Sequence, residues 1–250
     1  MFKDHFSAQA GLYAAARPGY PDALFDWLAS QPGERELAWD VGCGSGQCAL
    51  PLAARFERVV ATDPSAAQIA RAEGRGNIDY RVEPAELPSL PRGSVDLITV
   101  AQALHWFDVE AFYDAAYGVL RQDGVIAVWC YGLSVVQPSV DQVFMRLYRG
   151  LLAPYWPPER RHVENAYAEL GFPFEPIEAP RFAIEQDMEL SQYLDYLRSW
   201  SASQAYLREH GSDPVLQIAE PMTAAWGDPA QPRRVRWPLQ LKVGRPLPPR

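Results

Sequence analysis

The sequence predicts an α/β fold built on a doubly wound, mostly parallel seven-stranded sheet with helical cap insertions. Short apolar runs alternate with segments of helical periodicity over the first 130 residues, as in chains of strand–helix–strand units. The first run leads into Gly42, Gly44 and Gly46, and an acidic residue, Asp40 or Asp63, lies at the end of each of the first two runs. Because parallel strands end at one edge of a sheet, these groups are expected to meet in one ligand site.

Composition and charge narrow the class of protein. The chain has 250 residues, 48% hydrophobic and 22% charged, enough for one large core with insertions. A net charge of −8 argues against nucleic acid or an anionic membrane as partner. Cys43, Cys48 and Cys130 lack C-x-x-C spacing, which indicates a reducing compartment and no structural zinc or other metal. With neither a leader sequence nor an apolar run of about 18 residues, the protein is expected to be soluble and cytoplasmic.

The N-terminal region is expected to form two helices separated by prolines. Residues 3–16 have helical character and stop at Arg17-Pro18-Gly19-Tyr20-Pro21, because proline cannot continue a helix. Residues 22–30 carry apolar side chains at helical spacing and are expected to bury one face.

Five strands and three helices are expected next. The strands are 37–40, 59–63, 78–82, 95–100 and 125–129, and the helices are 47–55, 64–73 and 108–120. Pro64 favours the first turn of the second helix, and the third has the apolar spacing of a core-facing helix. Gln122-Asp123-Gly124 is expected to be the turn before the last of these strands.

Beyond residue 132 the pattern changes to proline-rich and aromatic segments. Helices are expected at 160–170, 188–210 and 213–226, and strands near 177–184 and at 233–243, where Pro238 favours an edge or a bulge. We interpret residues 1–132, 159–185 and 231–250 as the core domain, and residues 133–158 and 186–230 as helical cap insertions. The cap aromatics expected near the ligand are Tyr148, Tyr155, Trp156, Tyr193, Tyr196 and Trp200.

The glycine loop indicates which ligand the site takes. A dinucleotide fingerprint reads G-x-G-x-x-G, but Gln47 stands where its last glycine belongs. Asp40 would repel a pyrophosphate and attract a cation, and Cys43 supplies the small side chain that such a loop requires. Asp63, 21 residues after Gly42, is placed to accept the hydroxyls of an adenosine ribose. S-adenosylmethionine, a phosphate-free cation, fits this set better than NAD, although the ribose carboxylate alone serves both.

The segment Asp40-Val41-Gly42-Cys43-Gly44-Ser45-Gly46 resembles the first motif of the class I S-adenosylmethionine-dependent methyltransferases, D-x-G-x-G-x-G. Tyr13 with Arg17-Pro18-Gly19-Tyr20-Pro21, and the run His105-Trp106-Phe107-Asp108, look like the trans-aconitate methyltransferase-like, type 11 branch. The resemblance covers the first 130 residues well and the rest loosely. It implies a Rossmann-like fold, the cofactor S-adenosyl-L-methionine, the product S-adenosyl-L-homocysteine and methyl transfer to a small molecule.

The same resemblance extends the predicted cofactor site. It implies that Glu86 accepts the adenine amino group beside Ala85, and that Ala101 and Gln102 lie under the methionine part of the cofactor. Arg17, in a proline-pinned loop, suits a carboxylate of cofactor or substrate. The complete predicted set is Arg17, Asp40, Gly42, Cys43, Gly44, Gly46, Asp63, Pro64, Ala85, Glu86, Ala101 and Gln102.

His105 is the candidate catalytic residue, with a buried structural histidine as the alternative. In-line displacement requires a base only when the nucleophile must lose a proton. A carboxylate acceptor needs none, with Arg17 holding its other charges, whereas a hydroxyl or amine would use His105 as base. Two other functions stay open: an NAD-dependent oxidoreductase, and a cofactor-binding module without catalysis.

Overall fold

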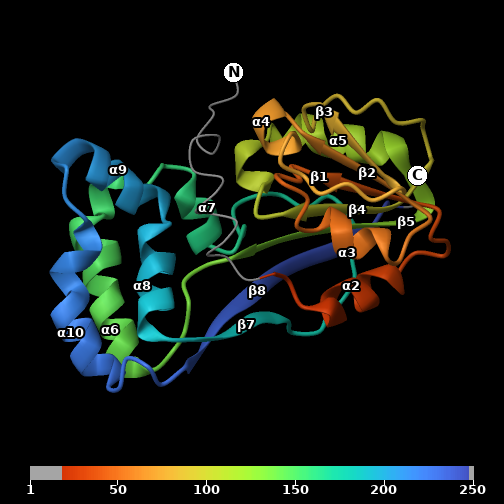
Figure 1. The fold of residues 1–250 in the computed structure, drawn as a ribbon. Coiled ribbons are helices and arrows are strands. Elements are labelled where there is room, and N and C mark those ends of the chain that lie inside the picture. The colour runs from red at the N-terminus through yellow and green to blue at the C-terminus, as the bar shows by residue number, and fades with distance from the viewer. Residues whose placement is uncertain (1–18, 248–250) are drawn as a thin grey trace.

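The structure, a computed structural model, describes residues 19–247 and is built around one mixed sheet (Figure 1). The helix predicted at 3–16, together with Tyr13, Arg17 and Pro18, lies outside the described residues. The strand order is β3-β2-β1-β4-β5-β8-β6, with β7 paired to β8 off this path. The predicted α/β, mostly parallel sheet is confirmed, with one strand more than the seven expected.

The parallel half of the sheet consists of five strands whose bounds agree closely with the sequence pattern. They are β1 Leu37–Val41, β2 Arg58–Asp63, β3 Ile78–Val82, β4 Val95–Ala101 and β5 Leu120–Tyr131. Every residue of β1 is buried because helices cover both faces of the sheet. The strand order reverses direction between β1 and β4, so their carboxyl ends form the switch point where ligands bind in such folds.

The antiparallel half is organised by the long strand β8, Arg233–Arg245. Its second half pairs with β5 and with the short strand β6, Glu175–Pro176, while its first half pairs with β7, Ala183–Met188. The single strand predicted near 177–184 is therefore wrong, because two separate segments meet β8 at different places. Pro238, which lacks a backbone N–H, lies where β8 changes partner from β7 to β5.

Helices α2 Asp22–Ala29, α3 Ala49–Ala53, α4 Ala66–Ile69 and α5 Val109–Val119 pack around the parallel strands. Two of them are shorter than predicted: α3 follows a turn that takes up Gln47 and Cys48, and the side chain of Ser65 caps α4. The turn predicted at Gln122–Gly124 is also wrong. These residues belong to β5, and a register shift against β4 between Val95 and Leu97 absorbs the irregularity.

The remaining helices form a lobe beside the sheet, and β8 runs from the sheet toward it (Figure 1). The lobe contains α6 Pro138–Arg146, the π-helical turn Leu147–Leu151, the 3-10 turns Ala153–Tyr155 and Pro214–Ile218, α8 Leu190–Arg198, α9 Ser201–His210 and α10 Ala219–Trp226. The continuous helix predicted at 188–210 is broken because the backbone of Trp200 is extended, and the one at 213–226 begins as a 3-10 turn.

Helix α7, Arg160–Glu164, lies between the lobe and the sheet (Figure 1). It ends six residues earlier than predicted because Ala166 and Tyr167 adopt left-handed φ angles of 52° and 57°, which no α-helix accommodates. Within residues 19–247, no helix is long and apolar enough to cross a membrane.

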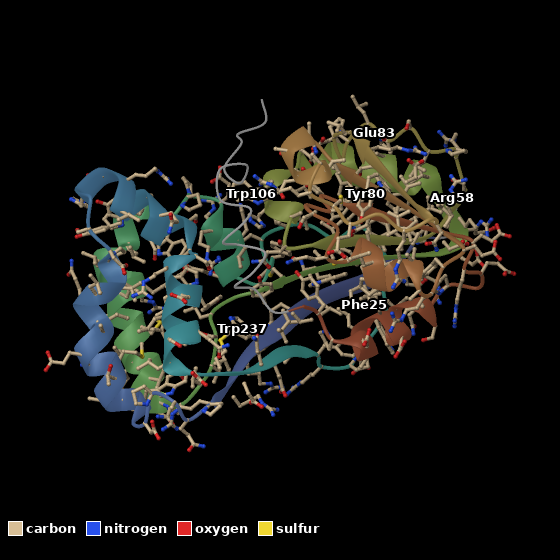
Figure 2. All side chains as sticks on the ribbon, viewed as in Figure 1. Phe25, Arg58, Tyr80, Glu83, Trp106 and Trp237 are labelled. Carbon is tan, nitrogen blue, oxygen red and sulfur yellow. The ribbon has the colours of Figure 1, made fainter. Side chains whose placement is uncertain are left out.

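The cap aromatics lie inside the lobe. Tyr148, Tyr193, Tyr196 and Trp200 are buried, and their rings contact one another or neighbouring aromatic rings. Trp237 of β8 joins this core by donating from Nε1 to the Tyr196 hydroxyl at 2.9 Å, and Figure 2 shows it on β8 near the lobe. None of the six expected aromatics lines the cavity at the carboxyl ends of the parallel strands, and the four buried ones hold the lobe together and attach it to β8.

Candidate active site

A cavity of about 730 Å³ opens at the carboxyl ends of the parallel strands. Nearly all of the predicted site residues line it: Asp40, Gly42, Cys43, Gly44, Asp63, Pro64, Ala85, Glu86, Ala101, Gln102 and His105. Gly46 is not among the lining residues, and Arg17 lies outside the described ones. The loops after β1, β2, β3 and β4 thus converge on one space, as the strand order requires.

The glycine loop after β1 owes its shape to left-handed backbone at Gly42 and Gly44, with φ of 66° and 56°. The backbone N–H groups of Gly42 and Cys43 donate to the Thr62 carbonyl oxygen at 2.8 and 3.0 Å, which ties the loop to the end of β2. A side chain at position 42 would collide with Ala103, whereas one at position 44 would meet no atom within 4 Å. The loop is therefore open to the cavity at Gly44.

Gly46 has a structural role in the glycine loop. Its φ is 90°, and a side chain there would collide with the hydroxyl of Tyr80 on β3. Figure 2 labels Tyr80 among the strands of the parallel sheet. The glycine at this position allows β3 and the loop to pack closely.

Asp63 is the last residue of β2, and backbone N–H groups from two loops hold its carboxylate in place. Its Oδ2 accepts from the Gly44 N–H at 3.0 Å and its Oδ1 from the Ser65 N–H at 2.8 Å. Each carboxylate oxygen can accept a further hydrogen bond. The carboxylate is thus held in one orientation beside the glycine loop.

Asp40 is the most unusual group in the site. It is 1% exposed, and its Oδ1 accepts from the Thr99 hydroxyl at 2.8 Å, while Oδ2 is buried without a hydrogen-bond partner among residues 19–247. Burial raises the pKa of Asp40 to about 7; repulsion by Asp63 acts in the same direction, and the Thr99 hydroxyl and the Ala49 N–H oppose it. An unpartnered buried carboxylate oxygen on a cavity wall fits a cationic ligand.

Ala85 and Glu86 follow β3 and line the cavity. Glu86 Oε1 accepts from the backbone N–H of Asp108 at 2.9 Å, and Asp108 in turn caps α5 through the Ala111 N–H. The contact ties the β3 loop to the start of α5. Only one oxygen of the Glu86 carboxylate is used in this way within the described chain.

Gln102 lines the cavity with a backbone φ of 56°, but its side chain turns to the neighbouring strand. The amide Nε2 donates to the Tyr131 carbonyl at 3.2 Å, and Oε1 accepts from the Tyr131 N–H at 2.8 Å. This two-sided contact joins the ends of β4 and β5. The side-chain amide of Gln102 is therefore engaged by β5, while Ala101 and Gln102 both line the cavity.

His105 lies on the 3-10 turn Leu104–Trp106 and contacts a residue that the sequence analysis missed. Its Nδ1 is 2.9 Å from the Tyr167 hydroxyl oxygen. Burial, together with repulsion by the nearby Arg160 and His162, lowers the pKa of His105 to about 3. The imidazole is therefore neutral across the physiological range, and its low basicity disfavours the predicted role as general base.

Several lining residues were not predicted, including Tyr20, Gln68, Tyr131 and Glu159. Glu159 immediately precedes α7, which packs against the 3-10 turn that carries His105. In Figure 2, Trp106 of that turn lies on the side of the sheet that faces α7. No signal in the sequence marks Glu159 or Tyr167. They flank α7, and α7 packs against the 3-10 turn that carries His105, which is far away in the sequence.

The cavity wall is acidic. Five carboxylates line it, from Asp40, Asp63, Glu86, Asp108 and Glu159, and among its described residues there is no lysine or arginine. Such a wall attracts a cation and repels phosphate. The residues present therefore fit a phosphate-free, positively charged ligand.

Comparisons with known proteins agree with this geometry. The methyltransferase domain family of type 11 matches residues 39–128. A protein of Dictyostelium discoideum assigned as a methyltransferase is 35% identical over 90% of this chain and 87% of its own length. CRG1 of Saccharomyces cerevisiae, assigned as an S-adenosylmethionine-dependent methyltransferase, is 26% identical over 82% of each chain. A solved structure from Anaeromyxobacter dehalogenans, assigned as a type II methyltransferase, is 49% identical, with a TM-score of 0.88, over 93% of this chain and 99% of that one.

Proposed function

This chain belongs to the S-adenosylmethionine-dependent methyltransferases of type 11, and we propose that it transfers the methyl group to a small organic acceptor. The observation that carries the proposal is the acidic cavity of about 730 Å³ at the sheet switch point. Its volume lies within the roughly 300–1,000 Å³ typical of small-molecule sites. Bound there, the cofactor supplies a methyl group activated by the adjacent sulfonium for in-line displacement.

The residues of the chain have separate tasks in this proposal. Asp40 pairs its free oxygen with the cofactor ammonium, and the oriented carboxylate of Asp63 accepts the ribose hydroxyls. Glu86 uses its second oxygen for the adenine amino group. Together they hold the cofactor in one pose, which aligns its methyl group with the acceptor.

Two classes of acceptor follow from different observations. The family resemblance suggests a carboxylate, which would need a counter-charge. Arg17 is the candidate, since the described wall offers none. The five carboxylates of the wall instead favour an acceptor without negative charge. Glu159 is the candidate to bind such an acceptor, because its side chain makes no hydrogen bond or ion pair among the described residues. The label-transfer assay below distinguishes the two classes.

The test is incubation of the full chain with methyl-labelled S-adenosylmethionine and a panel of small acids, phenols and amines. We expect label transfer to one class, lost in Asp63→Ala. Arg17→Gln should raise KM if the product is a methyl ester, and Glu159→Gln should raise KM if the acceptor is an amine. Tight cofactor binding without transfer to any small molecule would favour a binding module and overturn the proposal.

We propose further that the protein works in the cytoplasm without nucleic acid. Its three cysteines are free and buried, as expected in a reducing compartment. The acidic cavity and the net charge of −8 oppose the phosphate backbone of a nucleic acid. Fractionation of cells expressing the protein, and a mobility-shift assay at low salt, test these two statements.

A further inference from the structure

We propose that Tyr167 is a positioning residue that fixes His105 as the neutral tautomer protonated on Nε2. His105 then presents a hydrogen-bond donor to the methyl acceptor. The contact between His105 and the methyl acceptor rests on the proposed function. The tautomer itself is a property of the protein without any ligand.

The two nitrogens of His105 have different surroundings. Nδ1 faces the Tyr167 hydroxyl at 2.9 Å, and Tyr167 is 1% exposed. Nε2 makes no hydrogen bond within the described part of the chain, and it is not among the buried atoms left without a partner. Since His105 lines the cavity, Nε2 is the nitrogen that remains accessible from it.

The direction of the Tyr167–His105 bond follows from the single hydroxyl proton. Nδ1 is the acceptor that the structure places within hydrogen-bond distance of the Tyr167 hydroxyl, and the other group that faces this hydroxyl, the His105 backbone N–H, can only donate to its oxygen. Burial raises the pKa of Tyr167 well above its ordinary value, so the hydroxyl keeps its proton. Nδ1 therefore accepts through its lone pair, and the proton of the neutral imidazole is on Nε2.

The backbone around Tyr167 is arranged to hold this contact. Ala166 and Tyr167 both have left-handed φ angles, which are uncommon for a small side chain and strained for an aromatic one. The Tyr167 N–H donates to the His162 carbonyl at 2.7 Å, and Lys242 Nζ donates to the Tyr167 carbonyl at 2.6 Å. These two hydrogen bonds, one to α7 and one from β8, hold the left-handed backbone that places the Tyr167 phenol beside His105.

This tautomer defines what the acceptor must offer. An Nε2–H group binds a lone pair, such as that of a carboxylate, carbonyl or hydroxyl oxygen. It cannot at the same time remove a proton from the nucleophile. His105 thus orients an oxygen of the acceptor, and the reaction proceeds without His105 as base.

The tautomer can be measured directly by long-range ¹H–¹⁵N correlation spectra of the ¹⁵N-labelled full chain, with His105→Gln identifying the signals. We expect a protonated Nε2 and an unprotonated Nδ1, unchanged between about pH 5 and pH 8. Tyr167→Phe should shift the tautomer ratio, because Nδ1 loses its donor. Tyr113→Phe is the matched control: Tyr113 is also buried, but its hydroxyl has no partner in the described chain, so the His105 signals should stay in place.

A proton on Nδ1 in the wild-type protein, or an unchanged tautomer in Tyr167→Phe, would overturn the inference; neither result touches the proposed methyl transfer. If Tyr167→Phe does not fold, the wild-type spectrum alone decides. With an acceptor from the label-transfer panel, Tyr167→Phe should raise KM about threefold to tenfold, as for one oriented hydrogen bond. Its pH–rate profile should stay flat, and an unchanged KM would refute the acceptor contact.

Discussion

Replacing Asp40 with Asn is expected to stabilise the cofactor-free protein and at the same time weaken cofactor binding. Burial raises the pKa of Asp40 from 3.8 to about 7. Between these values the folded state binds more protons at this site than the unfolded state, so stability falls as pH rises through that window. This change in pKa corresponds to about 4 kcal/mol of stability lost by pH 8, more than half of it between pH 5 and pH 8.

Asn keeps an acceptor for the Thr99 hydroxyl but buries an amide without a partner, at a cost of about 1–3 kcal/mol. The net expectation at pH 8 is therefore an unfolding free energy about 1–3 kcal/mol above that of the wild type, shrinking or reversing at pH 5. Urea denaturation of both proteins at the two pH values measures this. S-adenosylhomocysteine should bind Asp40→Asn about tenfold to a hundredfold more weakly by calorimetry, because a charge-assisted contact is lost.

Asp96→Asn is the matched control, since Asp96 is equally buried on the adjacent strand β4. Its oxygens accept from the Glu36 and Leu37 N–H groups at 2.9 and 2.8 Å and from Arg121 at 2.7 Å. We expect this variant to lose about 1–3 kcal/mol of stability and to bind the cofactor normally. A stability difference between Asp40→Asn and wild type that does not change from pH 5 to pH 8 would refute the reasoning.

Three further predictions follow from named contacts. Asp63→Ala should raise the Kd for S-adenosylhomocysteine about tenfold or more in calorimetry with the fold intact; unchanged affinity would remove the ribose assignment. Gly42→Ala should lower the urea midpoint more than Gly44→Ala, because both positions have left-handed φ but only position 42 meets Ala103, and equal midpoints would contradict the packing. Trp237→Ala should cost about 3–5 kcal/mol in urea unfolding, since Trp237 is fully buried between β8 and the lobe; a loss below about 1 kcal/mol would show that the lobe does not depend on it.

The parts of the fold that could be predicted are those whose signal is local. Strands buried on both faces, such as β1 and β4, read as continuous apolar runs, and the glycines at 42 and 44 mark their left-handed turn directly. The break at Trp200 and the early end of α7 were missed because apolar periodicity continues through both, while tertiary packing sets the backbone.

The site shows the same division. Asp40 and Asp63 lie at the carboxyl ends of strands and Glu86 shortly after one, so the order of elements along the chain is enough to place all three at the cavity. The partner of His105 lies 62 residues away, and its position depends on α7, on two left-handed residues and on a contact from Lys242. The aromatic residues of the lobe mislead for a related reason: composition gives their number but not which face they bury.

The central claim is that the loop after β1 and the carboxylate of Asp63 together hold a phosphate-free adenosyl cation. A crystal structure of the full chain with S-adenosylhomocysteine tests it most directly. We predict the amino group of the ligand beside Asp40, its ribose hydroxyls on Asp63 and its adenine at Ala85 and Glu86. A ligand bound elsewhere, with the Gly42–Gly44 loop making no contact to it, would contradict the claim.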